Sequence, residues 1–111
     1  MDFHIVTASH EDLETWATVE AGIDGYGQLV VRYTHYHYDQ SKSHVSASID
    51  KEETATLARQ LEVDPDGIID VLIDEYEDAF PFNPSEVETI FQDILEKILD
   101  YGVHYRLNDH R

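Results

Sequence analysis

Hydrophobic and polar residues alternate along the first half of the chain. Val45, Ala47 and Ile49, for example, are separated by Ser46 and Ser48. A period of two residues is typical of strands that bury one face, because successive side chains point to opposite sides of a sheet. The pattern predicts four strands, over residues 3–7, 13–20, 28–38 and 44–50. In the second of these, the residues that share one face are Leu13, Thr15, Ala17 and Val19.

Turn-forming residues separate the predicted strands. Residues 21–27 contain three glycines around an Asp24-Gly25 pair, and residues 39–43 form a short polar stretch. Asp-Gly pairs and neighbouring glycines favour the tight turns that join antiparallel strands. We therefore expect the first half of the chain to form an antiparallel β-meander.

The hydrophobic period becomes helical after residue 50. Residue types that favour helix starts come before three segments, at Asp50, Asp64-Pro65 and Asn83-Pro84. The sequence predicts helices over residues 51–61, 65–80 and 84–101. The side chains that the first helix should bury are Thr54, Leu57, Ala58 and Leu61.

Gly102 follows the third helix as a natural left-handed stop, and residues 103–107 can form a short final strand. A run of strands followed by a run of helices is typical of the α+β class. We predict a single α+β domain over residues 1–111. An N-terminal antiparallel meander of three or four strands would be followed by three helices packed on one face of the sheet.

The charge of the chain is strongly negative and unevenly distributed. The 24 Asp and Glu residues outnumber the 7 Lys and Arg residues, which gives a net charge of −17. Residues 60–96 contain twelve acids and no Lys or Arg. Such a charge repels nucleic acids and anionic membranes and favours a basic protein partner. The competing interpretation is that the acidic surface serves only solubility.

The chain has no cysteine, which excludes disulfides and thiolate metal ligands. Residues 1–4 show no basic leader before an apolar run, and no segment is long and apolar enough to span a bilayer. We expect a soluble cytoplasmic protein.

Residues 54–72 resemble the helix-turn-helix of DNA-binding domains, with Ala58 where two helices would cross and Leu61 and Ile68 at the corner. The resemblance covers about twenty residues and implies a tight helix pair. DNA binding would require cationic or polar donors on the second helix, which instead carries aspartates such as Asp66 and Asp70. The charge therefore argues against direct nucleic-acid binding.

The same helix supports the opposite hypothesis. Aspartates recur every four residues from Asp66 to Asp78, about 6 Å apart along a helix axis. Such a row of negative charge would mimic a nucleic-acid backbone and bind a basic cleft, as in DNA-mimic inhibitors, although the chain carries no motif of such a family. The alternative is an ordinary solvated helix face. The predicted partner-binding residues are Asp66, Asp70, Asp74, Glu77 and Asp78.

Histidines in the central hairpin form a second candidate site. His35 and His37 share one strand face, and a hairpin could bring His44 close to them, which would give three imidazoles for Zn²⁺. The alternative is that residues 28–49 form a tyrosine- and histidine-rich seam of a homodimer, sensitive to metal or pH.

Motifs for catalysis are missing from the sequence. No serine lies on a nucleophile elbow, and the glycines of residues 22–27 join two strands rather than opening a helix onto a phosphate. We therefore expect no enzymatic activity and no cofactor other than the zinc considered above. The most consistent function is non-enzymatic binding to a basic protein surface.

Overall fold

The computed structural model describes residues 2–10, 14–39 and 41–110 and has the predicted α+β fold. Its strands form one antiparallel sheet whose spatial order follows the chain. The strands are β1 (His4–Ala8), β2 (Trp16–Ile23), β3 (Leu29–Tyr36), β4 (Lys42–Ile49) and β5 (Arg106–His110). The helices between β4 and β5 are α1 (Lys51–Gln60), α2 (Pro65–Tyr76) and α3 (Pro84–Asp100).

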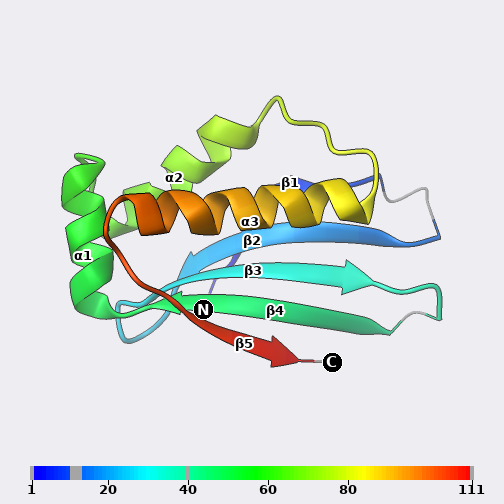
Figure 1. Cartoon of the computed structure of the whole chain (residues 1–111), viewed down its shortest axis with the longest axis horizontal. Coiled ribbons are helices and arrows are strands. Elements are labelled where there is room, and N and C mark those ends of the chain that lie inside the picture. Colours follow the sequence, from blue (N-terminus) through cyan, green and yellow to red (C-terminus); the bar gives the residue numbers. More distant parts are fainter. Residues whose placement is uncertain (1, 11–13, 40, 111) are drawn as a thin grey trace.

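Two of the three helices cover one face of the sheet, where the sequence predicts all three. α2 packs on β1 and β2, and α3 packs on β2 and β3. Figure 1 shows α3 running along the strands, whereas α1 stands across them at one end of the sheet. Contacts from the helices to β4 and β5 are weak, so the helix-facing side of these two strands is less well covered.

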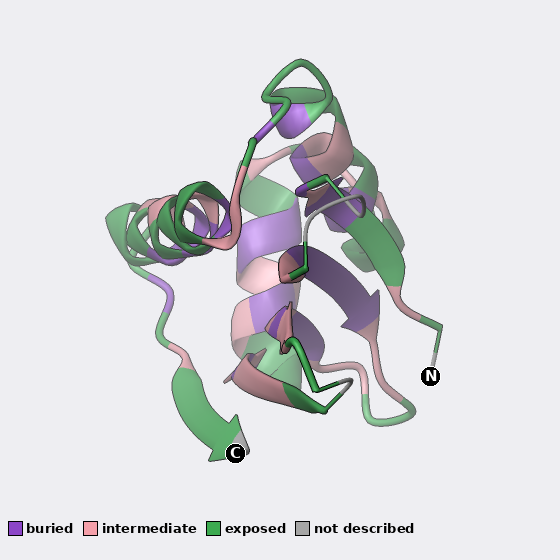
Figure 2. Cartoon of the chain, turned by 90° about the vertical axis from the view of Figure 1, so that its right-hand side faces the viewer, coloured by how far each residue is buried: buried purple, intermediate pink, exposed green. Residues whose placement is uncertain are grey.

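The hydrophobic core lies between the sheet and this helical layer, where Figure 2 shows the buried segments. Ala17, Ala21 and Ala47 are fully buried on the helix-facing side of the sheet, and their small side chains let the helices approach closely. The larger fully buried side chains include Val19, Leu29, Val31, Ile49, Ile68, Val87 and Ile94.

Thr54 joins α1 to the sheet. Its hydroxyl donates a hydrogen bond of 3.0 Å to the carbonyl of Ile49 and accepts one of 3.1 Å from the backbone N–H of Leu29. Thr54 is fully buried, as predicted, so both bonds satisfy groups that water does not reach. The predicted cap of α1 is also confirmed, because the side chain of Asp50 accepts from the N–H of Glu53 at 2.8 Å.

The prediction placed the end of the second helix at residue 80, and this boundary is wrong. α2 ends at Tyr76, and Phe80 has a positive φ of 43°. Phe80 precedes Pro81, whose ring disfavours the helical conformation at the preceding residue. The last aspartate of the predicted row, Asp78, therefore lies in the turn beyond the helix.

The strand boundaries also differ from the prediction, most of all in β2 and β5. β5 begins at Arg106 rather than residue 103, because Val103 is buried in the core and the N–H of His104 donates to Glu53. Those residues connect α3 to the sheet edge. β2 extends to Ile23, so Ala21 belongs to the strand rather than to the turn. Leu13, predicted in this strand, lies outside the described residues.

Gly67 in the first turn of α2 provides a test of this packing. A Cβ there would lie 2.9 Å from the Cβ of Val63, closer than two carbons pack. We expect Gly67→Ala to destabilise the protein by about 1 kcal/mol, because overpacking outweighs the usual helix gain of alanine. Denaturant unfolding would measure the change.

Gly25→Ala is the matched control, since a Cβ at Gly25 meets no atom within 4 Å. It should leave the unfolding free energy unchanged or slightly higher. Equal effects of the two substitutions would contradict the close contact between Gly67 and Val63.

Candidate functional site: an acidic helical face

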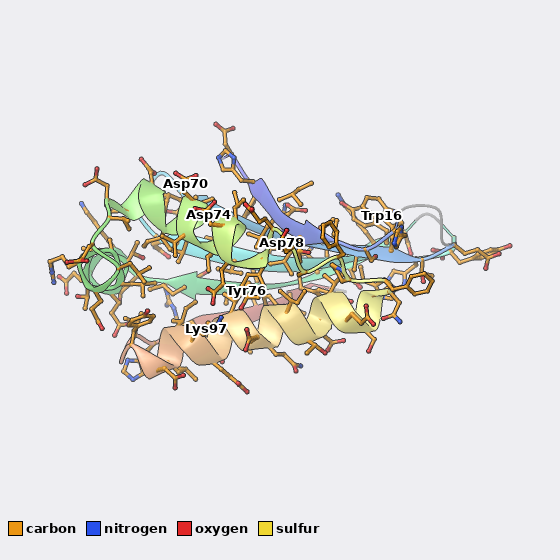
Figure 3. The ribbon with its side chains drawn as sticks, turned by 90° about the horizontal axis from the view of Figure 1, so that it is seen from above. Trp16, Asp70, Asp74, Tyr76, Asp78 and Lys97 are labelled. Carbon is orange, nitrogen blue, oxygen red and sulfur yellow. The ribbon has the colours of Figure 1, made fainter. Side chains whose placement is uncertain are left out.

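The acidic residues of α2 lie on the side of the helix that faces solvent. Asp66, Asp70 and Asp74 are all exposed, about 6 Å apart along the helix axis. Figure 3 shows Asp70 and Asp74 along α2 and Asp78 beyond the helix end. The core holds the opposite side of the helix in place through Ile68, Ile69, Leu72 and Tyr76.

The other two predicted binding residues, Glu77 and Asp78, lie in the turn after α2 and are also exposed. Thus all five predicted carboxylates are accessible, but only three of them lie on the helix at the predicted spacing of four residues. We define these five residues as the acidic face.

No cation of the described residues forms an ion pair with the acidic face. The ion pairs in residues 2–10, 14–39 and 41–110 involve other carboxylates: Glu20 with Arg32, Glu53 with His104, and both Glu75 and Asp93 with Lys97. The negative potential of the acidic face therefore extends into solvent without an internal counter-charge.

Lys97 is placed between α2 and α3. Its ammonium group contacts Glu75 of α2, lies 3.4 Å from the carboxylate of Asp93 and donates to the hydroxyl of Tyr76 at 3.1 Å. Tyr76 in turn donates to Asp93. Figure 3 shows Tyr76 and Lys97 in the space between the two helices. We call this group of four side chains, Glu75, Tyr76, Asp93 and Lys97, the clamp. Its ammonium group pairs with two carboxylates where the helices meet.

The protonation states in the clamp follow from these contacts. The hydrogen bond from Tyr76 lowers the pKa of Asp93, so that it remains ionised at neutral pH. Partial burial acts to lower the pKa of Lys97, but its hydrogen bonds to Glu75 and Tyr76 outweigh that effect and raise it. Burial and the bond to Asp93 raise the pKa of Tyr76 to about 12. The clamp is thus an ion pair over the physiological pH range.

Two exposed phenylalanines lie directly beyond the acidic face. The residues are Phe80, 78% exposed, and Phe82, 57% exposed. The positive φ of Phe80 is rare for a large side chain and places an aromatic ring in solvent at a cost in backbone strain. The helical period predicts Phe80 on the buried side of the second helix, and residue type predicts core or loop anchors at Phe80 and Phe82. The predicted burial of Phe80 is wrong; the available signal was an aromatic residue directly before a proline in a short loop.

The structure brings together two of the three predicted metal ligands. The rings of His35 and His37 lie 4.4 Å apart on the helix-facing side of the sheet. His44 pairs with Thr34, which places it on the other face. The predicted cluster of three histidines is therefore not formed, and among the described residues no group of three His, Asp or Glu side chains is arranged to hold a metal ion.

His35 and His37 line a groove of about 820 Å³ beside α3, over the part of the sheet that the helices cover weakly. Its apolar lining includes Tyr33 and Phe91, whose rings are 6.0 Å apart. His37 shares a 2.9 Å hydrogen bond with Ser43, whereas the buried Nε2 of His35 has no hydrogen-bond partner. Burial and the neighbouring His37 lower the pKa of His35.

The predicted dimer seam, residues 28–49, forms the interior of the sheet. β3 pairs with β2 and β4, and β4 pairs with β3 and β5. Both strands therefore have occupied edges. A partner could reach this hairpin only at its open sheet face or at its tip.

Comparisons of the chain with family models, with curated proteins and with solved structures gave no match. No helix within residues 2–10, 14–39 and 41–110 has the length and hydrophobicity needed to cross a membrane.

The lowered pKa of His35 predicts how stability depends on pH. The unfolded state binds a proton more readily than the folded state, so stability should decrease as the pH falls through about 6.5 toward the folded-state pKa. We expect His35→Gln to reduce this loss, as measured by denaturant unfolding between about pH 7.5 and pH 5.

His4→Gln is a suitable control, because His4 is an exposed residue of β1. It should leave the pH dependence of the wild-type chain unchanged. A His35→Gln variant with the full wild-type pH dependence would show that burial of the His35 ring does not disfavour its protonation.

Proposed function

We propose that this chain is a non-enzymatic binding protein whose acidic face engages a basic surface on another protein. The observation that carries the proposal is the set of five exposed carboxylates without an internal counter-charge, three of them on one helix held by the core. A surface of this kind attracts cationic proteins and steers their approach.

The exposed phenylalanines give this surface a candidate apolar anchor. Charge accelerates and orients association, whereas buried aromatic side chains commonly supply most of the binding free energy at an interface. Phe80 follows Asp78 by two residues and is held in a strained conformation. The proposed partner therefore has a cationic surface with an apolar pocket at its border.

The rigid spacing of the aspartates supports a more specific form of the proposal. They form a regular row of negative charge with a separation of about 6 Å along the helix axis, and a protein that binds the phosphate backbone of nucleic acid presents a cationic cleft suited to such a row. In this form the chain would compete with nucleic acid for such a protein, and would itself bind no nucleic acid.

The proposal predicts that reversing two charges abolishes capture of the partner. The wild-type chain, immobilised and incubated with native lysate, should retain a basic protein at about 0.1 M salt and release it at about 0.5 M, because salt screens exposed charges beyond about 8–10 Å. Asp70→Lys with Asp74→Lys should lose this protein. Mass spectrometry of the eluates would identify it.

A second double variant with the same net charge shows whether capture depends on the position of the carboxylates or only on the total charge of the chain. Glu52→Lys with Asp100→Lys changes the charge by the same amount at exposed residues of α1 and α3. This variant should retain the basic protein. Capture that is the same for all three chains, or that survives high salt, would contradict a role for the acidic face.

A further inference from the structure

The two edge strands of the sheet, β1 and β5, differ in how regularly they pair with their neighbours. β1, at one edge, has an irregular register between Ile5 and Thr7 where it pairs with β2. Such bulges disturb the row of backbone groups that an edge presents and protect it from pairing with another strand. β5, at the other edge, pairs in continuous register with β4 from Arg106 to His110. Its outer side is thus the regular edge of this sheet.

β5 lies at an edge of the sheet, and its residues 106–109 are exposed. Leu107 is 56% exposed although it pairs with the fully buried Ala47. Leu107 lies on the helix-facing side of the sheet, where it borders the groove beside α3. An accessible regular edge with an exposed leucine is a favourable template for strand pairing.

The charge of this edge favours a second copy of the chain as the occupant. β5 contains one base, Arg106, and one acid, Asp109, so its net charge is zero, in contrast to −12 for residues 60–96. Two chains of net charge −17 repel each other across most of their surfaces. They can approach most closely along β5.

We propose that β5 pairs with β5 of a second copy to form a symmetric dimer with one continuous ten-stranded sheet. Antiparallel pairing about a two-fold axis requires the axis to be perpendicular to the sheet, so both helical layers lie on the same side. Side chains of directly paired residues must lie on the same face of the sheet. Even-numbered residues therefore pair only with even-numbered residues, and odd-numbered only with odd-numbered, so the two-fold axis passes through one residue of β5.

Chemistry selects one of these registers. Centring the axis on Leu107 pairs this leucine with its symmetry mate and pairs Arg106 with Asn108. Centring it on Asn108 instead pairs Leu107 with Asp109, and centring it on Arg106 pairs two arginines. The register centred on Leu107 covers the exposed leucines and opposes no like charges, so the dimer adopts it.

The acidic helices do not prevent this association. α3 packs over β2 and β3, so five strand spacings separate the two copies of β3 across the dimer. At about 4.8 Å per spacing this is roughly 24 Å, about three Debye lengths at physiological ionic strength. Repulsion between the helical layers is therefore largely screened, and it weakens further as salt is added.

The dimer would also present two acidic faces on the same side of one sheet. If the proposed function holds, a partner with two basic surfaces gains affinity from this arrangement, since the second contact becomes intramolecular. The dimer itself depends only on β5 and is independent of the acidic face.

Cysteine cross-linking tests the register directly, because the chain has no native cysteine. Directly paired residues on adjacent strands have Cβ atoms about 4.5–5.5 Å apart, near the range in which disulfides form. Leu107→Cys should form a disulfide-linked dimer under mild oxidation. Phe82→Cys, at a residue of matched exposure (57%), should remain monomeric under the same conditions. Equal rates of cross-linking for the two variants would overturn the proposed register.

Sedimentation equilibrium of the full chain tests the association itself. The wild-type chain should show a monomer–dimer equilibrium that shifts toward dimer between about 0.05 M and 0.5 M salt, the opposite of the salt dependence expected for the basic partner. Leu107→Lys should remain monomeric while Phe82→Lys dimerises like wild type, with circular dichroism confirming that both fold. A wild-type chain that is monomeric at every concentration and salt, or an equilibrium that Leu107→Lys leaves unchanged, would overturn the dimer. Neither result would affect the capture experiment on the acidic face.

Discussion

Burial of apolar side chains between the sheet and the helices is the interaction on which the rest of the structure depends. α2 and α3 carry many carboxylates and lie side by side, so their charges oppose the arrangement. Fully burying one large aliphatic side chain stabilises a fold by roughly 1.5–3 kcal/mol, whereas an exposed charge pair contributes about 1 kcal/mol or less. The inner faces of the two helices contain nine buried residues, and their burial therefore outweighs the repulsion.

Acidic and basic residues are concentrated on opposite sides of the molecule. The helical layer contains the acidic face, and Lys97 of α3 pairs with Glu75 of α2 and with Asp93. The strand register places Arg32, Lys42 and Arg106 on the sheet face that the helices leave open. Arg32 forms an ion pair with Glu20 there, at 2.6 Å. The resulting asymmetry would orient an approaching basic protein toward the helical side.

Much of the fold follows from local sequence patterns. Alternation in β4 identified its buried residues, and the capping residues Asp50 and Asn83 marked true helix starts. The sequence could not determine the end of α2, because competition between helix formation and the turn before Pro81 depends on tertiary packing. It also could not determine hairpin register, on which the position of His44 depends, since a shift of one residue moves a side chain to the other face of the sheet. The exposure of Phe80 likewise depends on packing.

Apolar burial thus holds together a helical layer whose carboxylates repel one another. The most direct test is the urea-unfolding free energy of the wild-type chain at neutral pH, measured from about 0.02 M to about 0.5 M sodium chloride. Stability should rise with salt, and the rise should be smaller when Asp70 and Asp74 are both replaced by Asn. Stability that falls with salt would show instead that favourable ion pairs, and not apolar burial against repulsion, dominate the helical layer.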